Sequence, residues 1–481
     1  MPDSAPPASD VAGLAALEAA LARDLARLNH PPAPWVPERT GPDGCAALDV
    51  LLVGGGMNGL AAAFALRRLG IARIRQVDRR PAGQEGPWLT YARMERLRSP
   101  KHLAGPVQGI AALTFRAWYE AQHGAEGWEA LGHIPRPVWA AYLQWFAQAS
   151  GAAVENGVAV EHVRPAAEFV AVTLRHAGGA EEVVQCRQLV LATGREGQAR
   201  PRVPAPFRPW LGERVRHSSD PIDFAAFHGR RVAVIGLAAS AYDNAAEAAE
   251  AGAEVTLIGR AAAVPRLNKM RQTVYPGFAH GFAALDDAER LRWLGHVTES
   301  RIAPPRHTVQ RVAAAGVRLI TGAEITAVAP AGAALRLETT AGAVEADLVI
   351  LGTGFAIDLA AAPELADLAP AILTYRDLLG DGEGAMGELL DCPALDPGFG
   401  FRARPGAAMA GLGRIRCYTH ASQPSLGNLA SDIPHAGEGA ERLARAIAEA
   451  LFVEDRAHHW QRLLDYAEPE LLGDEWPEGG A

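Results

Sequence analysis

Two turns rich in small residues, 54–59 and 236–241, each follow an apolar run in this sequence. The first, Gly54-Gly55-Gly56-Met57-Asn58-Gly59, follows the apolar run 48–53, and Asp78 ends the next apolar run, 24 residues after Gly54. In such a turn the first glycine makes the bend, the second lets the backbone approach a pyrophosphate, and the third lets the helix pack closely on the strand. The acid accepts hydrogen bonds from ribose hydroxyls. We predict a dinucleotide site comprising Gly54, Gly56, Asn58, Gly59, Asp78 and Arg79.

The second turn, Gly236-Leu237-Ala238-Ala239-Ser240-Ala241, follows the apolar run 231–235. Arg260 stands 24 residues after Gly236, at the position equivalent to Asp78. An acid there would repel a 2′-phosphate, whereas an arginine can pair with it, so this turn suits NADPH better than NADH. Ala238 departs from the pattern, because its methyl group stands where the pyrophosphate would approach. The predicted residues of this site are Gly236, Ala238, Ser240, Ala241 and Arg260.

A chain with two dinucleotide sites can pass a hydride from a nicotinamide to a flavin. We therefore assign FAD to the first turn and NADPH to the second. The chain has no GxSxG, HExxH or GK[ST] motif, and its four cysteines are widely scattered. Hence no catalytic triad and no metal site is predicted, and the chemistry is expected to reside on the cofactors.

The alternating strand and helix patterns around both turns predict an α/β fold with parallel sheets. Each turn is followed, further along, by a strand ending in Thr-Gly, at Thr193-Gly194 and at Thr353-Gly354. We predict two Rossmann-like dinucleotide-binding domains, with the NADPH domain inserted into the FAD domain. The expected divisions are an N-terminal helix and linker (1–44), a discontinuous FAD-binding domain (45–205 and 341–455), an NADPH-binding domain (206–340) with a helical insertion (261–315), and a C-terminal tail (456–481).

Composition limits the classes of partner. The formal net charge of −9 argues against nucleic-acid binding, which needs a basic face. No apolar run reaches the roughly 18 residues of a membrane span, and the first residues lack the features of a secretory signal. Scattered cysteines are typical of a reducing compartment, so we expect a cytoplasmic protein. The expected partners are a small-molecule substrate and O2, and the chain could form a homo-oligomer.

The motifs resemble those of the class B flavin-dependent monooxygenases, which include flavin-containing monooxygenases, Baeyer–Villiger monooxygenases and amine N-hydroxylases. Residues 347–355 are similar to the Asp-x-x-x-Leu-Ala-Thr-Gly-Tyr stretch of the N-hydroxylases, with Gly352 for Ala and Phe355 for Tyr. Residues 210–218 resemble the aromatic-x-Gly-x-x-x-His linker, with one extra residue before His217. Gly86-Pro87-Trp88 resembles the segment that lies against the flavin, and the resemblance covers most of residues 45–455.

The resemblance implies a specific chemistry. NADPH reduces FAD, O2 adds to the flavin, and the resulting C4a-(hydro)peroxyflavin transfers one oxygen atom to the substrate. The protein excludes water and orients the target atom. The resemblance also adds Trp88, Thr193, Gly194, Gly352, Thr353, Gly354, Phe355, Gly427 and Asn428 to the expected cofactor residues.

The substrate is expected to be small, polar and nitrogen-containing. The aspartate of the Baeyer–Villiger active-site segment has no counterpart after Trp88, which favours N-hydroxylation or ring hydroxylation over Baeyer–Villiger or sulfur oxygenation. Candidates for contact with the substrate or NADP+ are Arg98, Lys101 and His102, which are also the candidate catalytic residues, with Asn268 and Lys269 from the insertion. The aromatic series Trp139, Tyr142, Trp145 and Phe146 has the spacing of a buried helical stripe and is expected in the core.

Two other classes of function fit part of the pattern. A disulfide-reductase-like flavoenzyme or NADPH oxidase shares the two-site architecture, but a disulfide reductase needs a cysteine pair beside the flavin, and Cys392 and Cys417 are 25 residues apart. A non-catalytic nucleotide-sensing protein would keep the fold as a switch, and Ala238 is the feature that favours it.

Overall fold

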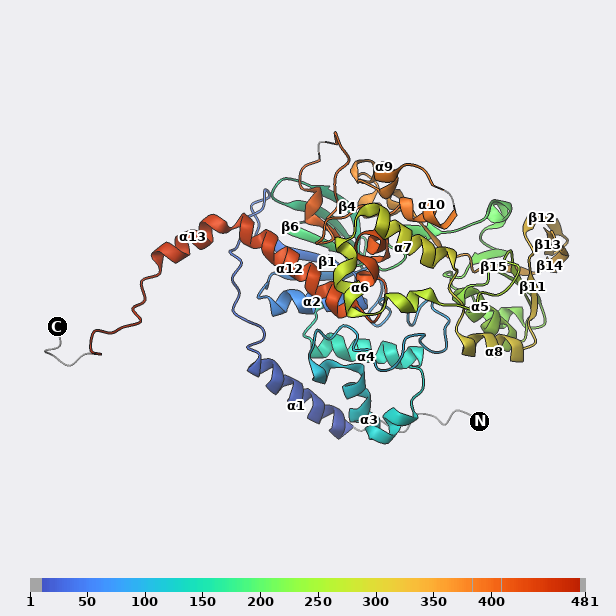
Figure 1. The fold of residues 1–481 in the computed structure, drawn as a ribbon, viewed down its shortest axis with the longest axis horizontal. Coiled ribbons are helices and arrows are strands. Elements are labelled where there is room, and N and C mark those ends of the chain that lie inside the picture. Colours follow the sequence, from blue (N-terminus) through green and yellow to red (C-terminus); the bar gives the residue numbers. More distant parts are fainter. Residues whose placement is uncertain (1–10, 383, 408, 476–481) are drawn as a thin grey trace.

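The computed structural model describes residues 11–475 except 383 and 408 (Figure 1). Its larger sheet has the strand order β3-β2-β1-β6-β5-β4, with β17 beside β6. Strands β1, β2, β3, β6 and β17 run parallel, whereas β4, β5 and β6 form an antiparallel meander. The bounds are β1 (Leu48–Val53), β2 (Ile74–Asp78), β3 (Val154–Asn156), β4 (Val158–Pro165), β5 (Val170–His176), β6 (Glu181–Leu191) and β17 (Ile415–Cys417).

Two layers of helices cover this sheet. Helix α2 (Met57–Arg68) begins directly after the first glycine turn and packs against α12 (Ala436–Glu454). On the other side of α2 lie α1 (Val11–Arg27), α3 (Phe115–Ala130) and α4 (Arg136–Ala149). The aromatic stripe of α4 is buried in this helical layer, which confirms the predicted core; its members are Trp139, Tyr142, Trp145 and Phe146.

The second sheet has the order β11-β10-β9-β15-β8 and is parallel throughout. Helices α5 (Ala239–Glu250) and α8 (Arg306–Ala314) pack together beside it, and a three-stranded antiparallel sheet, β12-β13-β14, follows β11. The strand bounds are β8 (Val215–His217), β9 (Arg231–Ile235), β10 (Glu254–Gly259), β11 (Arg318–Thr321), β12 (Ile325–Ala331), β13 (Ala334–Thr339), β14 (Gly342–Ala346) and β15 (Leu348–Leu351).

Strand pairing corrects two predicted boundaries. The sequence predicts the return to the first domain at residue 341, but β14 pairs with β13, and β15 pairs with β8 and β9 of the second sheet. The predicted insertion spans 261–315, but α8 is the crossover helix between β10 and β11, as a parallel pair requires. The sequence does not reveal either boundary, because a β-hairpin and a crossover helix cannot be told from an insertion by their residue pattern alone.

The chain leaves and re-enters the first domain through one narrow ribbon. Strand β7 (Ala199–Pro201) pairs antiparallel with β16 (Phe355–Ile357). The amide of Arg202 donates to the carbonyl oxygen of Gly354 at 2.9 Å, and the Thr353 hydroxyl donates to the carbonyl oxygen of Arg202. Both crossings between the sheets are therefore hydrogen-bonded to each other.

The insertion between β10 and α8 packs against the last third of the chain. It contains a short 3-10 helix (Lys269–Thr273), α6 (Pro276–Gly281) and α7 (Asp287–Glu299). Helix α7 contacts α10 (Gly384–Leu390) and α11 (Gln423–Leu426), and Nη1 of Arg290 donates to the carbonyl oxygen of Ser425 at 3.2 Å. Helix α9 (Tyr375–Leu379) lies beside α10.

The predicted C-terminal tail, 456–481, begins with a helix. After α12, helix α13 (Arg456–Asp465) continues away from the body of the molecule, as Figure 1 shows. The predicted N-terminal helix is present as α1, whereas residues 1–10 and 476–481 of the predicted terminal segments lie outside the described residues. Within the described chain, no helix is both long and apolar enough to cross a bilayer.

Candidate active site

The first glycine turn is packed so tightly that two of its glycines cannot carry a side chain. Gly54 has φ +117°, and a Cβ there would lie 2.4 Å from the carbonyl oxygen of Ala192. A Cβ on Gly59 would lie 2.0 Å from the carbonyl oxygen of Gly54. Gly56 differs, because the nearest atom to its Cβ would be Cα of Gly86 at 3.7 Å. The space beside Gly56 is thus left for something other than this turn, which fits a pyrophosphate.

Some polar side-chain atoms near this turn have hydrogen-bond partners within the chain, and others have none. Asp78 is buried, and its carboxylate accepts from the amides of Gly55 (2.7 Å) and Arg80 (2.8 Å). Nδ2 of Asn58 donates to the carbonyl oxygen of Ala430 at 2.7 Å. Among the described residues, Oδ1 of Asn58 and Oγ1 of Thr193 are buried without a hydrogen-bond partner. Such atoms normally find one, so a bound FAD that meets them fits this structure.

Two other predicted FAD residues lie beside the turn. The ring of Trp88 packs edge-to-face on Trp139 with centroids 6.2 Å apart, and Arg136 donates to the Trp88 carbonyl oxygen. This fixes the segment after Gly86 to the helical layer. Arg79 is largely exposed and lies 3.5 Å from Glu196.

The second glycine turn is accommodated differently. Gly236 has φ +126°, and a Cβ there would lie 2.5 Å from the carbonyl oxygen of Gly352. A Cβ on Gly352 would lie 2.6 Å from Cβ of Ala241, so the extra methyl of Ala241 fits because Gly352 has none. Ala238 and Ser240 are exposed at the start of α5, where helix N–H groups have no intrahelical partner. An anion can therefore reach them.

Arg260 directly follows β10, at the carboxyl end of the strand. It is exposed, and within the described chain its guanidinium makes no hydrogen bond and no ion pair. The turn 352–355 lies nearby in the sheet, because β15 pairs with β9. Nε2 of His217 lies 3.0 Å from the carbonyl oxygen of Gly354, and its ring is 5.0 Å from that of Phe355. Burial lowers the pKa of His217, so the ring stays neutral at this junction.

The substrate candidates do not converge. Nζ of Lys101 donates to the carbonyl oxygen of Trp128 and lies 4.6 Å from the centre of the Trp128 ring, and His102 packs edge-to-face on the same ring. Both side chains therefore serve the packing of α3. Nζ of Lys269 lies 2.5 Å from Nε2 of His296 on α7. The structure gives these three residues local partners instead of a shared site.

Arg98 is linked through Ala303 to Leu267, the residue before Asn268. Nη2 of Arg98 donates to the carbonyl oxygen of Ala303 at 2.9 Å, and the Ala303 amide donates to the carbonyl oxygen of Leu267 at 2.9 Å. Oδ1 of Asn268 is buried and, among the described residues, has no partner. The two residues come from different domains, and the Asn268 acceptor is unused within the described chain.

A polar network that the sequence did not predict joins the insertion to the loop 423–430. Nδ2 of Asn428 donates to Oγ1 of Thr273 at 2.6 Å, and Nε2 of Gln423 donates to Oδ1 of Asn428 at 2.7 Å. The Asn428 side chain is therefore already hydrogen-bonded within the chain, and only its backbone could contact a flavin. Nothing in the sequence around Thr273 or Gln423 signals this pairing, because the two segments are 150 residues apart.

His420, in the same region, carries a buried Nδ1 without a partner among the described residues. Burial, together with the nearby Arg195 guanidinium, lowers the pKa of His420 to about 3. The ring is therefore neutral at any working pH and offers one donor and one acceptor to a bound molecule.

Asp243 on α5 is a buried carboxylate at the interface between the two domains. It is 4% exposed, and burial raises its pKa to about 6, with Thr308, Arg311 and Arg98 opposing the shift. Its Oδ1 has no hydrogen-bond partner among the described residues. The fold thus favours the neutral acid.

We expect Asp243→Asn to stabilise the protein at pH 8 and to have no such effect at pH 4. A raised pKa in the folded state means that stability is complete below the unfolded value of 3.8 and is lost as the pH rises through about 6. A rise in pKa from 3.8 to about 6 means that ionisation costs the folded state about 3 kcal/mol, and the amide avoids this cost. Thermal unfolding at both pH values measures this, with the exposed Asp367→Asn as control. An equal change at both pH values would contradict the assignment.

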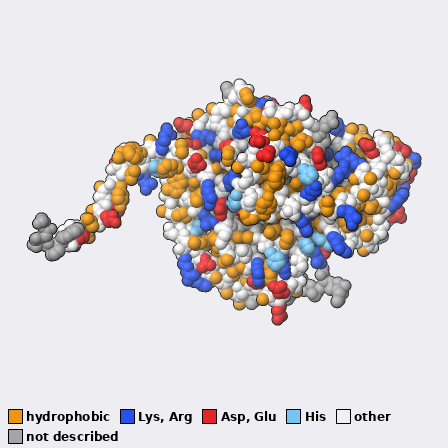
Figure 2. All heavy atoms as spheres, in the orientation of Figure 1, with side chains coloured by type: hydrophobic (Ala, Val, Ile, Leu, Met, Phe, Trp, Pro, Cys, Tyr) orange, Lys and Arg blue, Asp and Glu red, His pale blue; other side chains and the backbone are white. Residues whose placement is uncertain are grey.

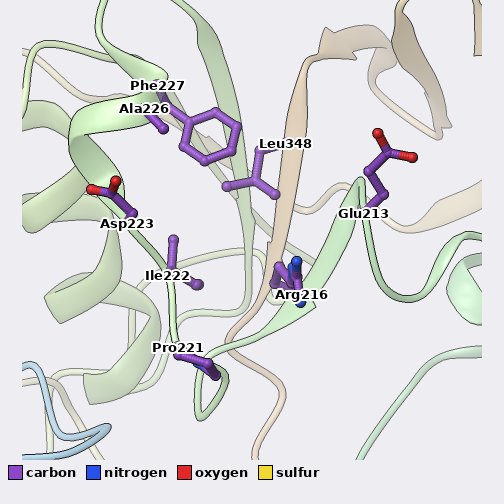
Figure 3. Close-up of a pocket in the computed structure, with 8 residues that line it drawn as sticks. All are labelled: Glu213, Arg216, Pro221, Ile222, Asp223, Ala226, Phe227 and Leu348. Atoms are coloured by element: carbon purple, nitrogen blue, oxygen red, sulfur yellow. The ribbon is translucent and has the colours of Figure 1, made fainter.

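A hollow of about 260 Å³ lies at the outer edge of the second sheet (Figure 3). Arg216 of β8, Phe227 and Leu348 of β15 are among the side chains around it. None of its lining residues belongs to the predicted cofactor or substrate sets. It lies apart from both glycine turns and has no part in the candidate site.

The four cysteines are unpaired, and burial raises the pKa of the Cys417 thiol to about 12. A thiol with so high a pKa is a poor nucleophile, which argues against the disulfide-reductase alternative. No cluster of potential metal ligands exists among the described residues.

Comparison with known proteins identifies the family. The FAD-NAD(P)-binding family matches residues 51–196, and the L-lysine 6-monooxygenase/L-ornithine 5-monooxygenase family matches residues 129–357. An FAD-dependent urate hydroxylase from Xanthomonas campestris pv. campestris is 38% identical over 97% of this chain and 98% of its own length.

Solved structures have the same fold. The ornithine hydroxylase of Pseudomonas aeruginosa aligns with a TM-score of 0.66 and 19% identity, over 84% of this chain and 100% of its own. The ornithine N-hydroxylase of Kutzneria sp. 744, solved with reduced FAD, NADP+ and L-ornithine, aligns with a TM-score of 0.65 and 17% identity, over 84% of this chain and 99% of its own. The chain belongs to the class B flavin-dependent monooxygenases, oxidoreductases that use FAD and NADPH, and within them to the family of that urate hydroxylase.

Proposed function

We propose that this monooxygenase hydroxylates urate or a closely similar oxidised purine. The observation that carries the proposal is the end-to-end identity of 38% with an FAD-dependent urate hydroxylase. Urate is small, polar and rich in nitrogen, as the sequence predicted for the substrate. One oxygen atom of O2 enters the purine, the other leaves as water, and NADPH is oxidised to NADP+.

The residues divide this work between two domains. The first glycine turn, with Asp78, Asn58 and Thr193, would hold FAD, and the second turn with Arg260 would hold NADPH. When bound, these cofactors supply hydride transfer and activation of O2. The chain's own groups bind, orient and exclude water. The strand pairing supports the proposed arrangement, in which the NADPH domain is inserted into the FAD domain.

We assign recognition of the substrate to Arg98 and Asn268. The free Oδ1 of Asn268 is an acceptor for a ring N–H, and the Arg98 guanidinium suits an anionic or carbonyl-bearing ring. Segment 268–273 lies close to the FAD residues, because Thr273 is hydrogen-bonded to Asn428, and Ala430 to Asn58.

The four unpaired cysteines support a reducing compartment, the cytoplasm, as the location of the protein.

The second candidate is N-hydroxylation of an amino acid such as ornithine or lysine. The match of residues 129–357 to the lysine/ornithine monooxygenase family favours it. The two candidates differ in the product, since one consumes a purine and the other yields a hydroxylamine.

The deciding experiment is a rapid-mixing absorbance measurement followed by product analysis. The yellow holoenzyme is reduced anaerobically with NADPH and mixed with oxygenated buffer, first alone and then with urate, ornithine or lysine. We expect a lasting absorbing species, distinct from oxidised and reduced flavin, whose decay is accelerated by urate and not by the amino acids. Urate loss should match NADPH and O2 consumption one to one.

Immediate return to oxidised flavin with release of H2O2 would contradict a monooxygenase and favour an oxidase. A lasting species that only ornithine or lysine discharges would replace urate by an amine substrate. A protein that binds nucleotide without consuming NADPH would point to the sensing alternative.

A further inference from the structure

The segment 456–475, here called the C-terminal arm, leaves the body of the molecule with its apolar side chains bare. Helix α13 buries none of its residues. Six large apolar side chains of the arm are 59% to 78% exposed: Trp460, Leu463, Leu464, Tyr466, Leu471 and Leu472. Figure 2 shows hydrophobic side chains, in orange, along the arm. A chain of this kind normally buries such residues, and contiguous exposed apolar surface marks an interaction site.

The direction of the arm is fixed where it leaves the body. Asp455 is fully buried and accepts from Nη2 of Arg39 at 2.6 Å and from Nη1 of Arg187 at 2.7 Å. The His459 ring stacks on Phe452 with centroids 4.8 Å apart and an angle of 7° between the rings. These contacts anchor the first turn of α13 to the body of the molecule.

A complementary surface exists on the same chain but far from its own arm. Tyr275 and Trp293 of the insertion flank the buried Phe278, with ring centroids 6.2 and 6.3 Å from it, and are 46% and 45% exposed. The insertion 265–303 has six basic and four acidic residues, whereas the arm has two basic and five acidic ones. Figure 1 shows the arm pointing away from α6 and α7. The arm and the insertion are complementary in charge and polarity, and they can therefore bind each other only when they belong to different molecules.

We propose that two copies of this chain associate by arm exchange, the C-terminal arm of each docking on Tyr275 and Trp293 of the other. Two symmetric arms would cover twelve large apolar side chains, in keeping with the roughly 1,600 Å² of a standard interface. A hollow of about 240 Å³ between His459, Leu463 and Tyr466 takes one side chain of the partner surface. A membrane is disfavoured as occupant, because anionic lipid repels an acidic arm.

Sedimentation velocity of the FAD-loaded full chain tests this. We expect a dimer at micromolar concentration for the wild type and a monomer for Leu463→Glu/Leu464→Glu and for Trp293→Glu, with association weakened at least a hundredfold. Tyr275→Glu provides a second variant of the receiving surface. Val183→Glu on β6, an exposed apolar residue elsewhere, should remain dimeric. FAD content and NADPH oxidation report that each variant is folded.

The sharpest result comes from mixing the two kinds of defective chain. The arm variant keeps an intact receiving surface and the Trp293 variant keeps an intact arm, so their mixture retains one of the two docked arms and should associate more tightly than either variant alone. A monomeric wild type, a dimeric arm variant or a mixture that associates no more tightly than its components would overturn arm exchange. Flotation of the wild type with anionic phospholipid vesicles would instead assign the arm to a membrane.

Discussion

Gly56→Val should weaken FAD binding about a hundredfold while the protein still folds. Gly56 has φ −74° and ψ −178°, which any residue adopts, and its Cβ would meet nothing closer than 3.7 Å in the chain itself. A valine there fills only the space into which the pyrophosphate is expected to approach. Overlap of this kind costs up to about 3 kcal/mol, so we expect FAD affinity to fall about a hundredfold.

Two comparison variants isolate the cofactor from the fold. Gly59→Ala places a methyl 2.0 Å from a backbone oxygen and should lower both the melting temperature and the FAD content. Gly132→Val, at an exposed position with open space, should lower neither. FAD content by absorbance, Kd by titration of the apoprotein and circular dichroism are the measurements. If the folded Gly56→Val variant bound FAD as tightly as the wild type does, the pyrophosphate could not lie at this turn.

Arg260→Ala should raise the KM for NADPH by roughly ten- to a hundredfold and leave that for NADH unchanged. The free, exposed guanidinium at the end of β10 has only a ligand to pair with, and a charge-assisted hydrogen bond to a phosphate contributes about 1.5–3 kcal/mol. Rising salt should raise the wild-type KM for NADPH and affect the variant much less, because screening acts on the lost contact.

Arg230→Ala is the matched control. Arg230 is also exposed, but it precedes β9 and therefore lies at the amino ends of the strands, whereas Arg260 lies at their carboxyl ends. Its loss should not change the preference between the two nucleotides. If Arg260→Ala changed the NADPH and NADH constants equally, the 2′-phosphate would have to be read by another group.

The local signals in the sequence were sufficient for the two turns and the elements around them. Spacing located β1, α2, β2, β9, α5 and β10, because each is a short segment with its own periodicity. The sequence did not predict which residues contact one another in the folded chain. Lys101 and His102 have residue types suited to binding, but only the folded chain shows that Trp128 engages both. The Thr273–Asn428 contact likewise depends on how the insertion folds over a distant loop.

The β7–β16 ribbon limits how the two sheets can move. Since both chain crossings are paired with each other, any change in the relative orientation of the two sheets must bend this one ribbon. The Asn428–Thr273 and Arg98–Ala303 hydrogen bonds also join the two domains, so the same change must break or rearrange them. These polar contacts therefore resist bending of the ribbon.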